Sequence, residues 1–176
     1  PGFTVEKKLG TARDRHGNEF SIIDLPGAYS LDAKSPDEEV TRAVLHGERA
    51  DTPRPDAVIC LIDASNLERH FYLATQVMEL GLPTIIVLNK SDEATERGIT
   101  IAAKKLAERL GVPVVPMQAN ARVGMEALQV TLSGAELAKP NWETVEGDTA
   151  ARYEKIRALL EGAVARSETE RLTPTD

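Results

Sequence analysis

The 176-residue sequence contains one cysteine and few aromatic residues, which make up 4% of the chain. A single cysteine cannot form an internal disulfide, and Cys60 lies in an apolar run where we expect a buried, unreactive thiol. The three histidines have no spacing typical of a metal site. We find no apolar run of membrane-spanning length and no stretch with the pattern of a signal peptide.

Basic residues are too few and too scattered to form a nucleic-acid surface. The chain has 21 Lys and Arg against 28 Asp and Glu, a net charge of −7, and no basic tract. Because phosphate backbones are bound by clustered Lys and Arg, we expect no nucleic-acid partner. A content of 28% charged and 41% apolar residues is typical of a globular chain. The length fits one domain, or one domain with a small appendage.

The first candidate site residues end the stretch 20–27, an apolar run that we expect to be a buried strand and that closes with Asp24, Leu25, Pro26 and Gly27. An aspartate at the end of a buried strand can hold a hydrated Mg²⁺ through its waters, and a glycine just after it lets a backbone N–H approach a terminal phosphate. Alone, this pattern is more often a simple turn.

A second stretch, 84–92, is another apolar run and ends in Asn89, Lys90 and Asp92. A carboxylate at Asp92 can accept both adjacent donors of guanine, N1–H and the exocyclic amino group, whereas adenine would leave this carboxylate unpaired. We expect Asn89 to tie neighbouring loops together and the stem of Lys90 to lie along the base. The alternative is a solvated strand-to-helix loop, which the presence of both stretches in this order disfavours.

Apolar runs and turn signals alternate at short spacing along the chain. They predict strands at 4–13, 19–25, 57–63, 83–88 and 112–117, and helices at 36–47, 67–79, 102–110, 125–132 and 149–166. The first two strands form a hairpin, and the run 57–63 is typical of a strand covered on both faces. The later βαβ units predict an α/β fold with a mostly parallel sheet flanked by helices. Ligands bind at the carboxyl ends of such strands, so we expect the loops at Asp24, at 89–92 and at 119–120 to converge.

Several longer stretches resemble a known GTPase family: 1–8, 24–31, 35–38 and 63–70, together with 89–92. On these residues the chain is similar to the cytosolic G domain of FeoB, the bacterial ferrous iron transporter family. The resemblance implies a P-loop NTPase-like G domain over 1–132. It further implies a linker at 133–148 and a short C-terminal helical appendage at 149–176, leading toward a membrane region that is not in this sequence.

The resemblance also implies roles at the phosphate end of a nucleotide. Thr4 would contact Mg²⁺ and the γ-phosphate as the switch I threonine. Asp24 would hold Mg²⁺ through a water, and Leu25, Pro26 and Gly27 would form switch II, where the Gly27 N–H senses the γ-phosphate. Thr4 and Gly27 are therefore the catalytic candidates, and Thr4 and Asp24 are the candidate metal-binding residues.

At the base end, the resemblance implies that Asn89, Lys90 and Asp92 bind guanine. Ala119 and Asn120 would present backbone N–H groups to the guanine oxygen. Ala119 stands where a serine is common in the family, so one side-chain hydrogen bond is lost while the backbone donor remains. The implied cofactors are GTP or GDP and Mg²⁺.

One family motif is absent, because the sequence contains no Gly-x-x-x-x-Gly-Lys-Ser/Thr phosphate loop. Relative to the family, 1–132 would lack the first strand, this loop and the first helix. That strand would lie between 19–25 and 57–63, so we expect both neighbours to expose an edge and an apolar face. We expect a chain without the loop to bind GTP weakly and to be inactive. With the loop, hydrolysis would be slow, because Ala28 replaces a water-orienting glutamine.

The function that the resemblance implies is that of a GTPase switch domain regulating ferrous iron transport across the bacterial inner membrane. It would lie at the cytoplasmic face as part of a membrane protein, with the permease region of the same full-length protein as its partner. The alternative is a nucleotide-independent interaction or scaffold domain derived from a GTPase fold.

Overall fold

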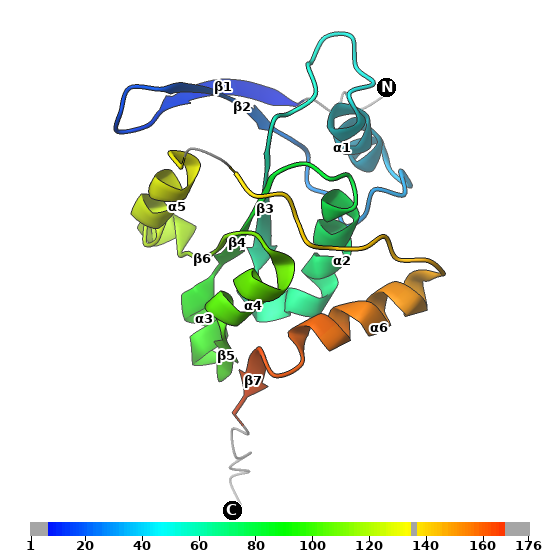
Figure 1. Cartoon of the computed structure of the whole chain (residues 1–176), viewed down its shortest axis with the longest axis vertical. Coiled ribbons are helices and arrows are strands. Elements are labelled where there is room, and N and C mark those ends of the chain that lie inside the picture. The colour runs from blue at the N-terminus through cyan, green and yellow to red at the C-terminus, as the bar shows by residue number, and fades with distance from the viewer. Residues whose placement is uncertain (1–6, 135–136, 168–176) are drawn as a thin grey trace, which may run out of the picture.

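A parallel three-stranded sheet forms the centre of the fold, in the order β3–β4–β6 (Figure 1). Its strands are β3 (Val58–Asp63), β4 (Thr84–Asn89) and β6 (Val114–Pro116). The computed structural model describes residues 7–134 and 137–167. The strands are joined through helices, so the predicted α/β fold with a parallel sheet is confirmed.

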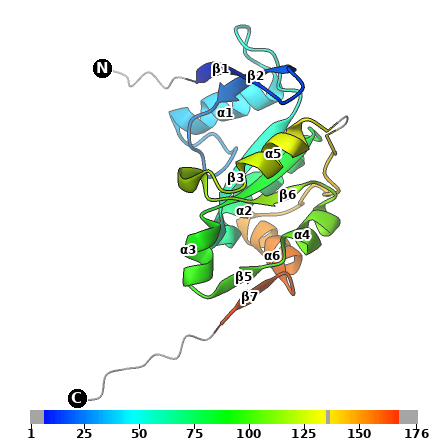
Figure 2. The same cartoon turned by 90° about the vertical axis from the view of Figure 1, so that its left-hand side faces the viewer.

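Helices lie on both sides of this sheet (Figure 2). One face packs against α2 (Leu67–Met78), α4 (Ala103–Leu110) and α6 (Thr149–Leu160), and the other against α5 (Met125–Leu132). The other described elements are α1 (Pro36–His46), α3 (Ser91–Glu96), the 3-10 helices η1 (Ala64–Asn66) and η2 (Ala119–Ala121), and the strands β1 (Lys8–Arg13), β2 (Glu19–Asp24), β5 (Ile99–Ile101) and β7 (Val164–Arg166).

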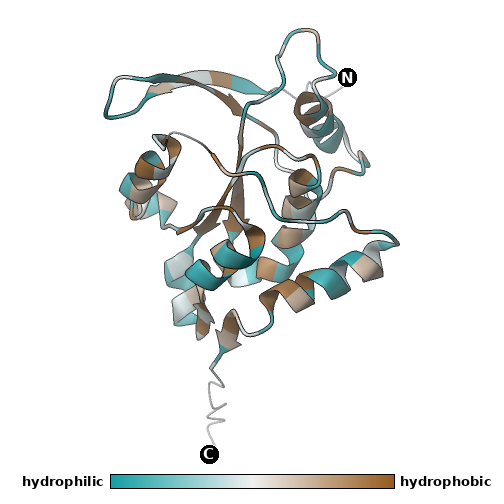
Figure 3. Ribbon diagram, viewed as in Figure 1, coloured by the Kyte–Doolittle hydropathy of each residue, from teal (hydrophilic) through white to brown (hydrophobic). Residues whose placement is uncertain are grey.

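The sheet face toward α2 carries the larger core. Side chains alternate along a strand, so Ile62 of β3 and Ile86 and Leu88 of β4 point to the same side, where all three are buried. Phe71 of α2 and Ile156 of α6 are fully buried against them. Burying an apolar side chain of this size stabilises the fold by about 1.5–3 kcal/mol. Figure 3 shows the resulting apolar centre and the polar outer faces of the helices.

The opposite sheet face is only partly covered. Ile85, Val87 and Val115 form a smaller core with α5. Ile59 and Leu61 of β3 lie in register with Ile85 and Val87 on this same face, yet they are 45% and 61% exposed. The prediction that 57–63 is covered on both faces is therefore wrong, whereas the expectation that this strand exposes an edge and an apolar face is confirmed. No described helix lies over this part of β3, which is an edge strand of the described sheet.

The N-terminal hairpin is confirmed but stands apart from the parallel sheet. β1 and β2 pair antiparallel, with Lys8 opposite Asp24. Asp14 closes the turn by accepting hydrogen bonds from the backbone N–H groups of His16 and Asn18. Among the described residues β2 pairs only with β1, and its Ile22 is 48% exposed. The expectation that 20–24 is a buried strand is wrong, because no described neighbour covers it.

The helix α1 begins and ends where the sequence predicts. Ser35 accepts a hydrogen bond from the Glu38 N–H, and Pro36 occupies the first turn. The Glu38 carboxylate reaches back to the N–H of Lys34, one residue before the cap. Gly47 ends the helix with φ of 71°, a conformation that glycine adopts without strain.

The C-terminal region differs from the prediction of one helix over 149–166. The helix α6 ends at Leu160, and Gly162 turns the chain with φ of 70°. The following β7 pairs antiparallel with β5, which the sequence analysis did not predict. The apolar residues kept a helical spacing as far as Val164, which is why one helix was predicted. Gly162 interrupts that helix, and Val164, a β-branched residue, pairs with Ile101 in a strand instead.

Residues 137–148 contain no helix or strand, as expected for a linker, but they pack closely on the domain. The Thr84 N–H donates to the carbonyl of Ala138, and the Asn141 N–H donates to the carbonyl of Leu110. Trp142 packs against the larger core. This segment therefore holds a fixed position on the described domain.

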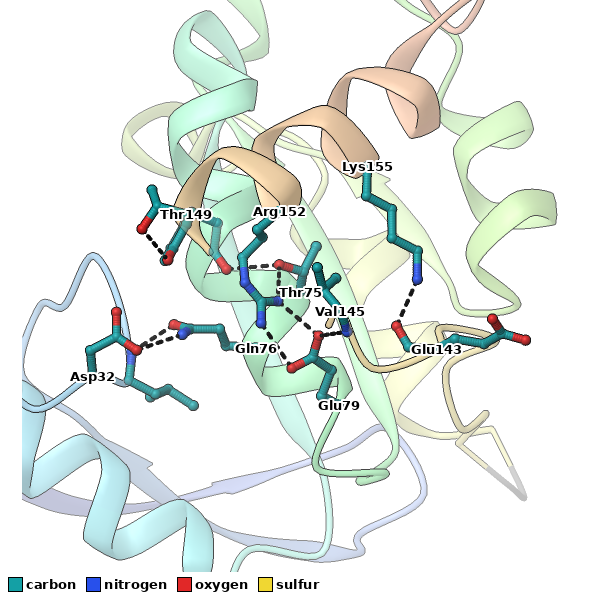
Figure 4. Close-up of polar contacts among 11 residues, drawn as sticks. Asp32, Thr75, Gln76, Glu79, Glu143, Val145, Thr149, Arg152 and Lys155 are labelled. Atoms are coloured by element: carbon teal, nitrogen blue, oxygen red, sulfur yellow. Dashed lines mark hydrogen bonds and ion pairs between the residues drawn. The ribbon is translucent and has the colours of Figure 1, made fainter. Parts of the chain in front are cut away.

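A buried ion pair attaches α6 to α2 (Figure 4). Arg152 donates to both carboxylate oxygens of Glu79, at 2.8 and 3.1 Å, and to the Thr75 hydroxyl at 3.0 Å. The Val145 N–H donates to the same carboxylate at 2.9 Å. Burial raises the pKa of Glu79, but the bonds from Arg152 and Val145 outweigh it and hold the pKa below its usual value.

Candidate functional site

The carboxyl ends of β3, β4 and β6 meet at one edge of the sheet, where polar residues gather. Asp63 ends β3 and lies in register with Asn89, which ends β4. The chain leaving β6 continues through Met117 into η2, which contains Ala119 and Asn120. Open α/β sheets bind ligands at this edge, so it is the candidate site.

Two of the three predicted loops are joined directly. The side-chain oxygen of Asn89 accepts a hydrogen bond from the Ala119 N–H at 3.0 Å. Next along the chain, the N–H and hydroxyl of Ser91 both donate to the carbonyl of Met117, at 3.2 and 3.1 Å. The expectation that Asn89 ties neighbouring loops together is confirmed.

The other base-end residues lie on the same two loops. Asp92 is half-buried in the first turn of α3, directly after the anchored Ser91. Ala119 and Asn120 are exposed in η2. The two loops carry a half-buried carboxylate and exposed backbone N–H groups, which are an acceptor and donors for a polar ligand.

Lys90 adopts an unusual backbone conformation between these anchored neighbours. Its φ is 56°, in the left-handed region that few residues other than glycine enter. Its ammonium lies 3.3 Å from Asp63, which also accepts hydrogen bonds from the N–H and hydroxyl of Ser65. Burial raises the pKa of Asp63, but the bonds from Ser65 and Lys90 outweigh it and leave the pKa below its usual value.

Sequence reasoning did not assign a functional role to Asp63. Two signals were available: the residue directly follows an apolar run, like Asp24 and Asn89, and it opens the stretch 63–70 that carries part of the family resemblance. The pairing of β3 with β4 shows the neighbour that the sequence does not reveal: Asp63 lies beside Asn89 at the same edge of the sheet.

The third predicted loop is not joined to the other two by a hydrogen bond between described residues, so its convergence stays a prediction. Asp24 is exposed at the end of β2, which belongs to a separate sheet in the described part of the chain. The carbonyl of Pro26 accepts a hydrogen bond from the Thr41 hydroxyl of α1 at 3.2 Å. Leu25 is half-buried and Gly27 is exposed. In the described part of the chain no strand lies between β2 and β3, so strand pairing does not connect the end of β2 to the edge of the parallel sheet.

The chain following Gly27 reaches the start of α2 through Tyr29. The guanidinium of Arg69 lies 4.3 Å from the centre of the Tyr29 ring, and the ring of His70 packs edge-on at 6.4 Å. Burial lowers the pKa of His70, and nearby Asp63 opposes this shift. Thr4 lies outside the described residues.

Metal binding by a cluster of protein ligands finds no support in the described ranges 7–134 and 137–167. No three His, Cys, Asp or Glu side chains gather there closely enough to hold an ion. A magnesium ion bound with a nucleotide does not need such a cluster, because it keeps several waters and takes phosphate oxygens with one or two protein ligands. Asp24 is exposed, as a carboxylate that bound such an ion would be, but β2 is not paired with the sheet whose edge carries Asn89.

Comparison with known proteins decides the family. The sequence model described as "Ferrous iron transport protein B" matches residues 1–132. The chain belongs to the FeoB family. The Fe(2+) transporter FeoB of Legionella pneumophila is 44% identical over 138 residues, which are 75% of this chain but 17% of that protein. The Escherichia coli K12 FeoB is 38% identical over 136 residues, again 17% of its length. The chain thus spans a small part of these relatives.

Solved structures of FeoB domains share the fold. The cytosolic domain of L. pneumophila FeoB superimposes with a TM-score of 0.80 at 30% identity, covering 94% of this chain and 87% of that one. The FeoB G-domain of Methanococcus jannaschii gives 0.66 at 42% identity, covering 74% and 80%. A mutant NFeoB of S. thermophilus bound to GDP gives 0.66 at 32% identity, covering 92% and 60%. The fold is therefore that of a FeoB G domain.

Proposed function

We propose that the chain is a guanine-nucleotide switch domain that regulates ferrous iron transport. The observation that carries this proposal is the bond from the Ala119 N–H to Asn89, which fixes the loops containing Asp92 and Asn120 at one sheet edge. Asp92 would accept the two adjacent N–H donors of guanine, and the backbone N–H of Asn120 would donate to its carbonyl oxygen, while the Ala119 N–H, which already donates to Asn89, would hold this loop in place. An FeoB relative bound to GDP supports the choice of nucleotide.

The phosphates of the nucleotide would be bound by residues outside the edge formed by β3, β4 and β6. In this proposal Asp24 holds Mg²⁺ through a water, Thr4 contacts Mg²⁺ and the γ-phosphate, and the Gly27 N–H senses the γ-phosphate beside Leu25 and Pro26. Mg²⁺ neutralises charge on the phosphates when bound. GTP hydrolysis, with Thr4 and Gly27 as the catalytic candidates, would be slow because Ala28 cannot orient water.

We further propose that 1–132 are a G domain lacking its first strand, phosphate loop and first helix. Two observations support this: β2 and β3 are not paired with each other, and Ile59 and Leu61 are exposed where a helix would cover them. The segment 133–148 would then be a docked connection, and 149–176 a C-terminal appendage that leads to a permease region. The domain would work at the cytoplasmic face of the bacterial inner membrane. No described helix is both long and apolar enough to cross a bilayer.

A nucleotide-independent scaffold is the second candidate, and the placement of β2 in a sheet separate from β3 in the described residues favours it. The two candidates differ in whether Asp92 determines base preference. Asp92→Asn places a donor against the guanine donors, so GTP affinity of the full-length gene product should fall by about 2–4 kcal/mol while xanthine nucleotides gain.

Asp37→Asn is the matched control, because Asp37 is also the second residue of its helix and is exposed. Titration with fluorescent nucleotides should show the change in base preference with Asp92→Asn alone. Equal GTP affinity in parent and Asp92→Asn would refute the assignment and leave the scaffold.

A further inference from the structure

Asp63 lies at the β3 end of the site edge and has no role in the proposed function. One of its carboxylate oxygens accepts hydrogen bonds from the Ser65 N–H at 2.9 Å and the Ser65 hydroxyl at 2.6 Å. The other oxygen lies 3.3 Å from the ammonium of Lys90. Because Ser65 fixes the first oxygen, the second is presented to Lys90 at a defined place.

The backbone of Lys90 is fixed as well. Its neighbours Asn89 and Ser91 are bonded to Ala119 and to the carbonyl of Met117, and its own φ is 56°. What remains free to rotate is the Lys90 side chain, a flexible four-carbon stem with a large rotamer entropy. Its side chain is 49% exposed and that of Asp63 22%, so the pair adds little to folding stability. What the ion pair does instead is orient the Lys90 side chain toward Asp63.

We propose that Asp63 is a positioning residue that holds the Lys90 stem across the site edge as a preformed surface for the guanine base. The inference rests on the proposed function. Asp92 and Ala119 lie on the loops after β4 and β6, whereas Asp63 ends β3 on the other side of Asn89. A stem anchored at Asp63 therefore runs from the loop after β4 toward the end of β3, along the edge that also carries Asp92. Ordering a contact side chain before the ligand arrives raises affinity by removing that cost from binding.

Asp63→Asn tests the role of the charge alone. Asparagine can still accept from the Ser65 N–H and begin η1, because it is as good a helix cap as aspartate, but it no longer attracts Lys90. In the full-length gene product, affinity for fluorescently labelled GDP and GTP should fall alike, by about 5- to 10-fold, because the base is common to both. The thermal unfolding midpoint should not change. Glu68→Gln is the control. Glu68 lies in the same stretch as Asp63 and forms an exposed ion pair with Arg157 of α6, so its replacement should leave nucleotide affinity unchanged.

A double-mutant cycle with Lys90→Met decides whether Asp63 acts through Lys90. Methionine keeps an apolar stem without the ammonium, so Asp63→Asn should have no further effect in that background. An equal loss of affinity in both backgrounds, or no loss in either, overturns the inference. Asp92→Asn is measured in parallel: if it weakens GTP while Asp63→Asn does not, the positioning role fails and the proposed function stands. If Asp92→Asn has no effect, the proposed function itself fails.

Discussion

Replacing Arg152 by methionine should destabilise the chain strongly, because Arg152 is the main partner of a buried carboxylate. The side chains of Arg152 and Glu79 are 10% and 14% exposed, so water cannot replace the lost contacts. Removing one partner of a buried ion pair costs about 3–5 kcal/mol, since the other charge stays buried and unpaired. We expect about 3 kcal/mol, the lower end, because Glu79 keeps its bond from the Val145 N–H.

The matched control is Arg157→Met on the same helix. Arg157 also donates to a glutamate at 2.8 Å, but the two side chains of that pair are 63% and 44% exposed. Exposed pairs contribute about 0–1 kcal/mol, so the control should stay within that range. Urea unfolding followed by circular dichroism gives both values, and fluorescence of Trp142, the single tryptophan, reports on the segment next to Glu79.

The pH dependence adds a second check. The folded pKa of Glu79 lies below its ordinary 4.5, so its stabilising effect is full above about pH 4.5 and is lost as the pH falls through the folded pKa. In Arg152→Met the carboxyl can become neutral at little cost, so the difference from the parent should shrink in acid. Equal destabilisation by Arg152→Met and Arg157→Met, or a difference that does not change with pH, would refute the reasoning.

Three further predictions concern other parts of the chain. Thr4→Ala in the full-length gene product should slow GTP hydrolysis and spare GDP binding, because the proposed contacts of Thr4 include the γ-phosphate; hydrolysis at the parent rate would exclude that role. Replacing the exposed Ile59 and Leu61 by threonine should reduce self-association, so that the chain stays monomeric up to a higher concentration in analytical sedimentation; unchanged self-association would show that another surface is responsible. Cys60 is partly buried against the larger core, and burial raises the pKa of its thiol to about 12, so alkylation at pH 8 should be much slower in the folded chain than in urea; equal rates would contradict a shielded thiol.

Local sequence signals predicted most helices and strands. The cap at Ser35, the glycine after α1 and the turn at 14–18 each fix backbone geometry through neighbouring residues, so no distant contact is needed. Elements that depend on distant pairing were missed. β5 and β7 are three residues each and exist as a pair contributed by segments more than 60 residues apart.

The site was predicted in the same uneven way. The link between Asn89 and the loop at Ala119 follows from two adjacent parallel strands, which periodicity can identify. The position of Asp24 could not be deduced, because it depends on which strand lies beside β2. Asp63 was overlooked because a carboxylate after an apolar run becomes informative only when register pairing shows what lies next to it.

The most direct test of the central claim is nucleotide competition on the full-length gene product. Labelled GDP bound to the protein is displaced with unlabelled GDP and, separately, with ADP. Because Asp92 would be left unpaired by adenine, GDP should compete at concentrations about 1,000-fold or more below those of ADP. Equal competition by GDP and ADP, or no binding of labelled GDP, would contradict a guanine-nucleotide switch at this edge of the sheet.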